Sequence, residues 1–266
     1  MPRYVPDMHW RSEDLVDRGV RQRGFDLEHE GRLIPGLLWT PDGARGPRPL
    51  VLIGHGGSNN KRQDYVVALA RRLVRHHGYA AAAIDGPVHG DRRADGGKNT
   101  ALTFLEFGQA WSSHPSMTDE MVSDWRRTLD SLQTLEDVGT APVGWWGLSM
   151  GTILGLPVVA AEPRVEAAVF GLMGRVGPTC DRITEDALKV HCPVLYLVQW
   201  DDELFDRERA FELFDLIGSE DKRLHANPGG HGEVPRAEFE ASERFLAERL
   251  GRAGCETGRD QEQQDQ

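Results

Sequence analysis

Apolar runs and amphipathic segments alternate along most of the chain. Runs with the length and composition of buried strands occur at residues 50–53, 79–85, 143–146, 165–170 and 194–199, with a shorter one at 223–225. Segments with apolar residues at helical spacing follow them, at residues 64–77, 119–138, 152–161, 205–217 and 236–250. This alternation predicts parallel strands joined by right-handed crossovers, with helices on both faces of the sheet.

The first part of the chain has a different pattern. Residues 24–29 and 33–40 read as two strands separated by a short polar turn at 30–32, which predicts an antiparallel hairpin. We therefore expect an α/β protein with a mostly parallel, doubly wound sheet and an N-terminal antiparallel hairpin. A length of 266 residues fits one domain, assigned to residues 1–250.

Two stretches lie outside the alternation. Residues 86–118 are too long for an ordinary connection and carry Phe104, Phe107 and Trp111 at helical spacing. We expect a small lid-like insertion here, whose aromatics either line a substrate pocket or pack on the core. Residues 251–266 are polar and are predicted to form a disordered tail.

Composition limits the kinds of partner. A net charge of −11 argues against nucleic acid, which requires a basic face. No apolar run approaches the roughly 20 residues that span a bilayer, and the charged first 23 residues argue against a secretory signal. The three scattered cysteines, Cys180, Cys192 and Cys255, favour a reducing compartment. These features predict a cytoplasmic globular protein whose oligomeric state, a dimer included, stays open.

The pentapeptide Gly-Leu-Ser-Met-Gly at residues 147–151 is the strongest chemical signal. A predicted strand precedes it and a predicted helix follows it. A sharp turn from strand to helix exposes the central side chain, Ser149, at the carboxyl edge of the sheet. Side chains at Gly147 or Gly151 would collide with the neighbouring strand or helix. Ser149 is therefore the predicted nucleophile.

A serine hydroxyl needs a base, and the base needs an orienting acid. His231 lies in a glycine-rich loop between the last short strand and the last helix, and is the predicted base. Asp202 follows the strand at 194–199 and is the preferred acid, with Asp201 second. Asp206 is a further candidate, and capping the next helix is the alternative role of Asp201 or Asp206.

The transition state of acyl transfer also requires hydrogen-bond donors for an oxyanion. One predicted donor is the N–H of Met150, directly after the nucleophile. The second is the N–H of Gly57, in the glycine-rich loop after the strand at 50–53, with Ser58 in reserve. His55 in that loop is interpreted as a structural histidine rather than a second base.

These motifs resemble the α/β-hydrolase superfamily, and within it the dienelactone hydrolase-like and prolyl oligopeptidase-like esterase branch. The resemblance rests on His-Gly-Gly at residues 55–57, Asp-Gly-Pro-Val-His-Gly-Asp-Arg at 85–92, the pentapeptide, Asp202 and His231. It covers about residues 24–250. Dienelactone hydrolases proper use cysteine where this chain has Ser149, which favours an esterase. The chain has no room for the propeller domain of the oligopeptidases.

No metal or cofactor is expected. The histidines, including His55 and His89, show no short metal-ligand spacing, and no phosphate loop or dinucleotide fingerprint is present. A structural role for His89 and Arg92, bracing the loop beside the site, is favoured instead.

The sequence therefore predicts a serine hydrolase that cleaves a small to medium carboxylic ester through an acyl-enzyme on Ser149. The predicted pocket residues are Trp111, Trp200, Phe104 and Phe107. Thioester, peptide or C–C hydrolysis, or acyl transfer, by the same residues stays open. So do elimination or cyclisation on this fold and a non-catalytic binding role.

Overall fold

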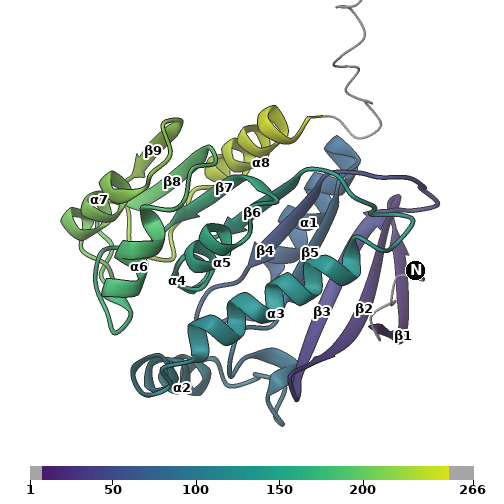
Figure 1. Cartoon of the computed structure of the whole chain (residues 1–266), viewed down its shortest axis with the longest axis horizontal. Coiled ribbons are helices and arrows are strands. Elements are labelled where there is room, and N and C mark those ends of the chain that lie inside the picture. Colours follow the sequence, from purple (N-terminus) through teal and green to yellow (C-terminus); the bar gives the residue numbers. More distant parts are fainter. Residues whose placement is uncertain (1–7, 252–266) are drawn as a thin grey trace, which may run out of the picture.

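A computed structural model describes residues 8–251, which form a nine-stranded sheet in the order β1-β2-β3-β5-β4-β6-β7-β8-β9 (Figure 1). The strands are β1 (Met8–Asp17), β2 (Val20–His29), β3 (Arg32–Pro41), β4 (Leu50–Gly54), β5 (Ala80–Ile84), β6 (Val143–Gly147), β7 (Val165–Gly171), β8 (Val194–Gln199) and β9 (Lys222–Asn227). From β1 to β5 neighbouring strands are antiparallel, and from β5 to β9 they are parallel. The expected mostly parallel α/β sheet with an N-terminal antiparallel hairpin is confirmed.

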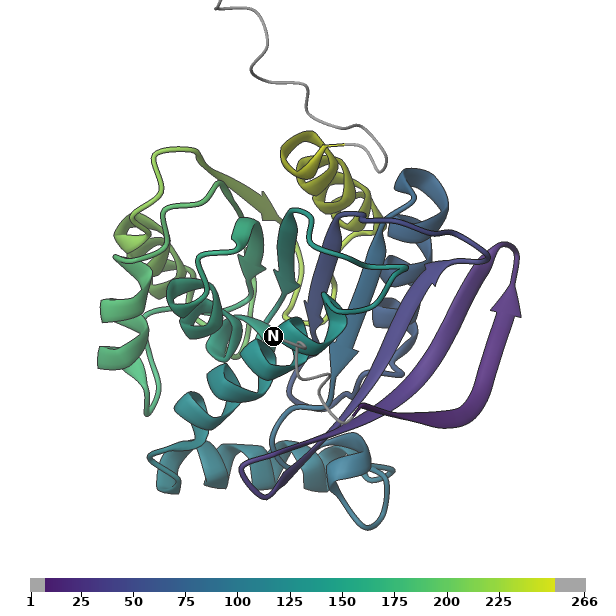
Figure 2. The same ribbon diagram turned by 45° about the vertical axis from the view of Figure 1, so that its right-hand side comes forward.

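Helices cover both faces of the sheet, as the alternation predicted. They are α1 (Asp64–His77), η1 (Gly90–Arg92), α2 (Thr100–Ser113), α3 (Met117–Leu132), α4 (Met150–Ile153), α5 (Gly155–Ala161), α6 (Cys180–Ala187), α7 (Arg207–Leu216) and α8 (Arg236–Leu250). Helices α1 and α8 pack on one face, and α3, α5, α6 and α7 cover the other (Figures 1 and 2). Each layer encloses its own apolar core. Among the described residues, no helix is long and apolar enough to cross a membrane.

Several elements differ from their predicted ranges. Strand β1 and helix α6 were not predicted, and α3 ends at Leu132 rather than at residue 138. The segment at 152–161, predicted as one helix after the pentapeptide, lies in two helices, α4 and α5, which meet at Leu154. Pro157 explains the break, because it has no N–H to donate to the carbonyl of Ile153 four residues earlier.

The insertion at residues 86–118 contains η1 and α2. The side chain of Asn99 caps α2 by accepting the N–H of Leu102 at 3.1 Å. Phe107 is buried on this helix, whereas Phe104 and Leu105 are 45% and 63% exposed. Helix α2 therefore packs with one face and leaves apolar side chains open to solvent. The tail predicted to be disordered lies, beyond residue 251, outside the described residues.

A buried ion pair supports the loop that leads into this insertion. Lys61 and Asp85 are both fully buried, and the Lys61 Nζ binds the Asp85 carboxylate and Asp91. Asp85 also accepts the backbone N–H of Lys61 at 3.1 Å and that of Asp91 at 2.7 Å. At Gly90 (φ +48°) a Cβ atom would lie 2.3 Å from the Asp85 carboxylate, so glycine is needed there.

Lys61→Met is expected to lower the free energy of unfolding by about 3–5 kcal/mol, because it leaves the Asp85 carboxylate buried without its counter-ion. Urea unfolding followed by circular dichroism measures this. Lys98→Met, at an exposed position, is the matched control and should change stability by less than about 0.5 kcal/mol. Adding Asp85→Asn to Lys61→Met should recover part of the loss. Equal urea unfolding midpoints for Lys61→Met and Lys98→Met would contradict the prediction.

Candidate active site

The turn between β6 and α4 holds Ser149 in a strained backbone conformation, with φ 58° and ψ −119°. A Cβ atom on Gly147 would lie 2.5 Å from the carbonyl oxygen of Gly151, and one on Gly151 would lie 2.5 Å from that of Gly54. Larger residues at either glycine would push the strand and helix apart. The two close approaches explain why this turn needs the glycines of the sequence motif.

Thr152 holds the turn against β7 by hydrogen bonds, a role that the sequence did not predict. The N–H of Ser149 donates to the carbonyl of Gly171 at 2.9 Å. The Thr152 hydroxyl accepts the N–H of Gly171 at 2.9 Å and lies within 2.9 Å of the carbonyl oxygens of Gly147 and Gly171. Thr152 is a hydroxyl residue in an otherwise apolar turn after the motif, and this feature of the sequence could have indicated its role.

The structure brings Ser149, His231 and Asp202 into one hydrogen-bonded chain. The Nε2 atom of His231 lies 3.0 Å from Ser149 Oγ, and its Nδ1 atom lies 2.8 Å from Asp202 Oδ2. A carboxylate can only accept, so the proton between His231 and Asp202 sits on Nδ1. That tautomer leaves the Nε2 lone pair facing the serine hydroxyl, as a general base requires.

The Asp202 carboxylate is ionised in this environment. Its side chain is 3% exposed, and Oδ1 accepts the N–H groups of Leu204 at 2.8 Å and Phe205 at 2.9 Å. Burial opposes ionisation, but the bonds from His231 and from these two N–H groups outweigh it, so the pKa of Asp202 lies below its usual range.

The other two candidate acids have different contacts. Asp201 accepts the N–H of Gly229 at 3.3 Å. Asp206 caps α7 by accepting the N–H groups of Glu208 and Arg209. The side chains of both aspartates bond to backbone N–H groups, whereas the Asp202 side chain bonds to the ring of His231.

Neighbouring side chains fix the loop that carries His231. Glu203 accepts the N–H of His231 at 2.9 Å, and Glu233 accepts that of Gly230 at 2.8 Å. The ring of Phe205 packs against His231 with centroids 5.6 Å apart. Gly229 adopts φ +109°, which favours glycine. No local pattern pointed to Glu203 or Phe205, because their contacts depend on how two distant loops meet.

Gly57 and Met150, the predicted oxyanion donors, lie side by side. A Cβ atom on Gly57 would be 3.7 Å from that of Met150. Within residues 8–251 neither backbone N–H has an acceptor on the protein. Tyr65 accepts the N–H of Gly56 at 2.7 Å, and His89 Nε2 lies 2.8 Å from the carbonyl oxygen of Gly57. The loop around Gly57 is thus held from both sides.

His55 is a structural part of the same loop. Its Nδ1 atom lies 2.9 Å from the carbonyl oxygen of Gly56, and its Nε2 atom accepts the N–H of Gly86 at 2.9 Å. Burial and the neighbouring His89 lower the pKa of His55 to about 3. A neutral imidazole with both nitrogens engaged links the loops after β4 and β5. Arg92 supports the second loop by donating to the carbonyl of Asp85 at 2.8 Å.

The four predicted pocket residues lie in different surroundings. Phe104 and Phe107 border Gly57, with ring atoms 3.6 and 3.7 Å from the point that a Cβ atom on this glycine would occupy. Trp111 stacks on Phe107 and donates to the Thr179 hydroxyl at 2.8 Å. Trp200 is 47% exposed and packs against Arg207 and Phe211 of α7.

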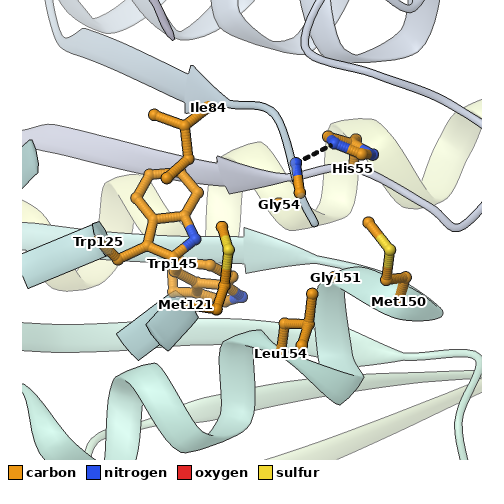
Figure 3. A pocket seen from close by; sticks show the side chains of 10 residues that line it. Gly54, His55, Ile84, Met121, Trp125, Trp145, Met150, Gly151 and Leu154 are labelled. Atoms are coloured by element: carbon orange, nitrogen blue, oxygen red, sulfur yellow. Dashed lines mark hydrogen bonds between the residues drawn. The ribbon is translucent and has the colours of Figure 1, made fainter. Parts of the chain in front are cut away.

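A small cavity lies beneath the turn, with His55 and Met150 at one end and Trp125 and Trp145 at the other (Figure 3). Its volume is about 10 Å³, room for one water molecule at most. This cavity is therefore too small to hold a substrate.

Comparison with solved structures places the chain in a family. A novel cold-adapted esterase from an Arctic intertidal metagenomic library is 40% identical, with a TM-score of 0.80 over 91% of this chain and 100% of that one. The chain belongs to the α/β-hydrolase superfamily. The same esterase has also been solved with zinc bound, at 37% identity, a TM-score of 0.76 and the same coverage.

Two more distant proteins also match the chain. Dienelactone hydrolase from Anabaena variabilis is 20% identical, with a TM-score of 0.67 over 88% of this chain and 100% of that one. A curated relative, the YtaP protein of Bacillus subtilis, named as a candidate hydrolase, is 26% identical over 169 residues, 60% of this chain. The matched segment spans about half of that relative, 54% of its length. No protein-family model matches the chain.

Proposed function

We propose that this α/β-hydrolase is a serine esterase that cleaves small to medium carboxylic esters through an acyl-enzyme on Ser149. The observation that carries the proposal is the hydrogen-bonded chain from Asp202 through His231 to Ser149 Oγ, with bonds of 2.8 and 3.0 Å. The 40% identical Arctic esterase supports the choice of an ester as substrate.

The reaction follows from this geometry. Ser149 Oγ adds to the ester carbonyl while its proton passes to His231 Nε2, and Asp202 stabilises the resulting imidazolium. Collapse of the tetrahedral intermediate breaks the bond to the alcohol, which takes the proton from His231. A water molecule then attacks the acyl-enzyme with His231 again as base, and releases the carboxylic acid and the free serine.

The oxyanion of each tetrahedral intermediate would bind the N–H groups of Gly57 and Met150. Both are unpaired within the described residues and adjacent. Preorganised donors of this kind contribute most when they are rigid, and the contacts of Tyr65 and His89 hold the Gly57 loop in place.

Covalent labelling tests the proposed nucleophile directly. A fluorophosphonate probe should modify Ser149, identified by mass spectrometry of the peptide that contains it, and should abolish hydrolysis of p-nitrophenyl acetate in proportion to labelling. Absence of labelling in a folded preparation would favour the non-catalytic alternative. Running the reaction with a competing alcohol distinguishes hydrolysis from acyl transfer, because transfer yields a new ester instead of the acid.

Phe104→Ala should change chain-length preference. Phe104 borders Gly57 and is half exposed, so we propose that it contacts the acyl chain. The ratio of kcat/KM for p-nitrophenyl hexanoate to that for the acetate should fall about fivefold to tenfold, the loss of roughly one buried apolar contact. Leu105→Ala, at the more exposed neighbouring position on α2, is the matched control. An unchanged ratio in Phe104→Ala would remove this residue from the pocket.

We also propose a cytoplasmic location. Cys180 and Cys192 form no disulfide, which suits a reducing compartment. Fractionation of the producing cells with an antibody to the protein tests this, and recovery of the protein outside the cytoplasmic fraction would contradict it.

A further inference from the structure

Three side chains of types that can ligate metal ions converge between α1 and α8, on the face of the sheet away from α3 and α5. His76 and His77 are the last two residues of α1, and Glu243 lies on α8. One ligand atom from each lies within 4.8 Å of the other two. His76 Nδ1 is 2.6 Å and His77 Nε2 is 2.9 Å from the same oxygen, Glu243 Oε1.

The end of α1 explains how adjacent residues reach one point. Side chains at consecutive helical positions diverge by about 100° around the axis. Helix α1 ends at His77, and Gly78 turns the chain in the left-handed conformation with φ 70°. His77 packs against Tyr79, with ring centroids 5.4 Å apart. Its Nε2 atom thereby faces the same carboxylate as Nδ1 of His76.

The Glu243 carboxylate is buried and is oriented by Arg72. The Glu243 side chain is 4% exposed, and its second oxygen, Oε2, accepts Arg72 Nε at 2.7 Å. His76 is 47% exposed, so a solvated ion can reach the three donor atoms from that side.

Two imidazole nitrogens and one carboxylate oxygen are ligands that Zn²⁺ prefers, whereas Mg²⁺ and Ca²⁺ prefer oxygen alone. We propose that His76, His77 and Glu243 form a Zn²⁺ site that joins α1 to α8. Binding moves the proton of each imidazole to its other ring nitrogen, and water completes the coordination. The bond between Arg72 and Glu243 Oε2 orients the ligating carboxylate, as outer partners do in metal sites.

The sequence predicts no metal site, because Glu243 lies far along the chain from the two histidines. Glu243 lies 166 and 167 positions from the two histidines, so no short ligand motif exists. The proposed zinc site also lies apart from Ser149 and its hydrogen-bonded partners. Helix α1 starts beside the Gly57 loop, whereas the histidines are at its other end. Zinc should therefore act on stability and leave the site around Ser149 intact.

Thermal unfolding of the full chain tests the site. The apparent Tm of the wild type in ZnCl₂ at about 100-fold above Kd should exceed that in EDTA by roughly 5–10 °C. MgCl₂ should give no shift. In His76→Gln/His77→Gln the zinc shift should fall below about 1 °C, because the amides still donate to Glu243 but ligate metal poorly. His114→Gln, which alters another histidine paired with a carboxylate, should keep the wild-type shift.

Calorimetric titration with ZnCl₂ and ester hydrolysis complete the experiment. The wild type should bind one zinc ion per chain, and the double variant should bind none. If the double variant does not fold, His76→Gln alone should weaken zinc binding at least tenfold. No zinc shift in the wild type, or equal shifts in the wild type and double variant, would overturn the proposal. Equal shifts accompanied by inhibition would place the zinc at His231 and Asp202 instead.

Discussion

Ser149→Ala should lower kcat/KM for p-nitrophenyl acetate by about 10⁴-fold to 10⁶-fold, because no other group can form the acyl-enzyme at this position. The effect should be nearly independent of pH and of acyl chain length, since the nucleophile itself is missing. Steady-state hydrolysis with purified protein measures it. Residual turnover near the uncatalysed rate is the expected result.

The variant should remain folded. Alanine adds no atoms to the turn, and the backbone bond from residue 149 to Gly171 and the contacts of Thr152 remain. Ser113→Ala is a suitable control, because Ser113 is exposed and, within residues 8–251, its hydroxyl bonds only to the carbonyl of Gln109 in its own helix. Turnover close to that of the wild type in a folded Ser149→Ala protein would eliminate the proposed mechanism.

Asp202→Asn should lower kcat by about 10³-fold to 10⁴-fold while leaving KM within a few-fold. An asparagine amide that donates to His231 Nδ1 selects the tautomer with the proton on Nε2, and that tautomer cannot accept the serine proton. Asp201→Asn is the matched variant, since Asp201 is the neighbouring residue but contacts Gly229 rather than His231. It should keep kcat within about threefold of the wild type.

Stability gives a second measurement for the same pair. The pKa of Asp202 is lowered in the folded protein, so its ionised form stabilises the fold above the ordinary carboxylate pKa. That contribution disappears as the pH falls through the lowered value. The difference in unfolding free energy between the wild type and Asp202→Asn should therefore shrink from pH 6 to pH 3.

For the kinetic comparison, a larger loss of kcat in Asp201→Asn than in Asp202→Asn would assign the acid to Asp201 instead.

The linear pattern of residues predicted the scaffold well, because periodicity is a local property. Helices α1 and α8 have the predicted bounds, and the strands from β4 to β8 agree within about a residue. The errors occur where local signals conflict with context. Strand β1 has a run of polar and charged residues at 11–14 and no regular alternation, and it forms because it pairs with β2. Residues 180–187 form a helix that the apolar pattern did not reveal.

By itself the sequence predicted the alternation of strands and helices from β4 onward apart from α6, because periodicity is local. It also predicted the turn at Ser149, the candidate base His231 and a short set of candidate acids, because each depends on residue type beside a predicted strand end. Only the tertiary structure decided which groups touch. It separated Asp202 from Asp201, placed Phe104 beside Gly57, and packed Trp200 on α7. It also brought Glu243 to His76 and His77. Such contacts join residues far apart in the chain, and their distances follow from how helices pack on the sheet rather than from any local pattern.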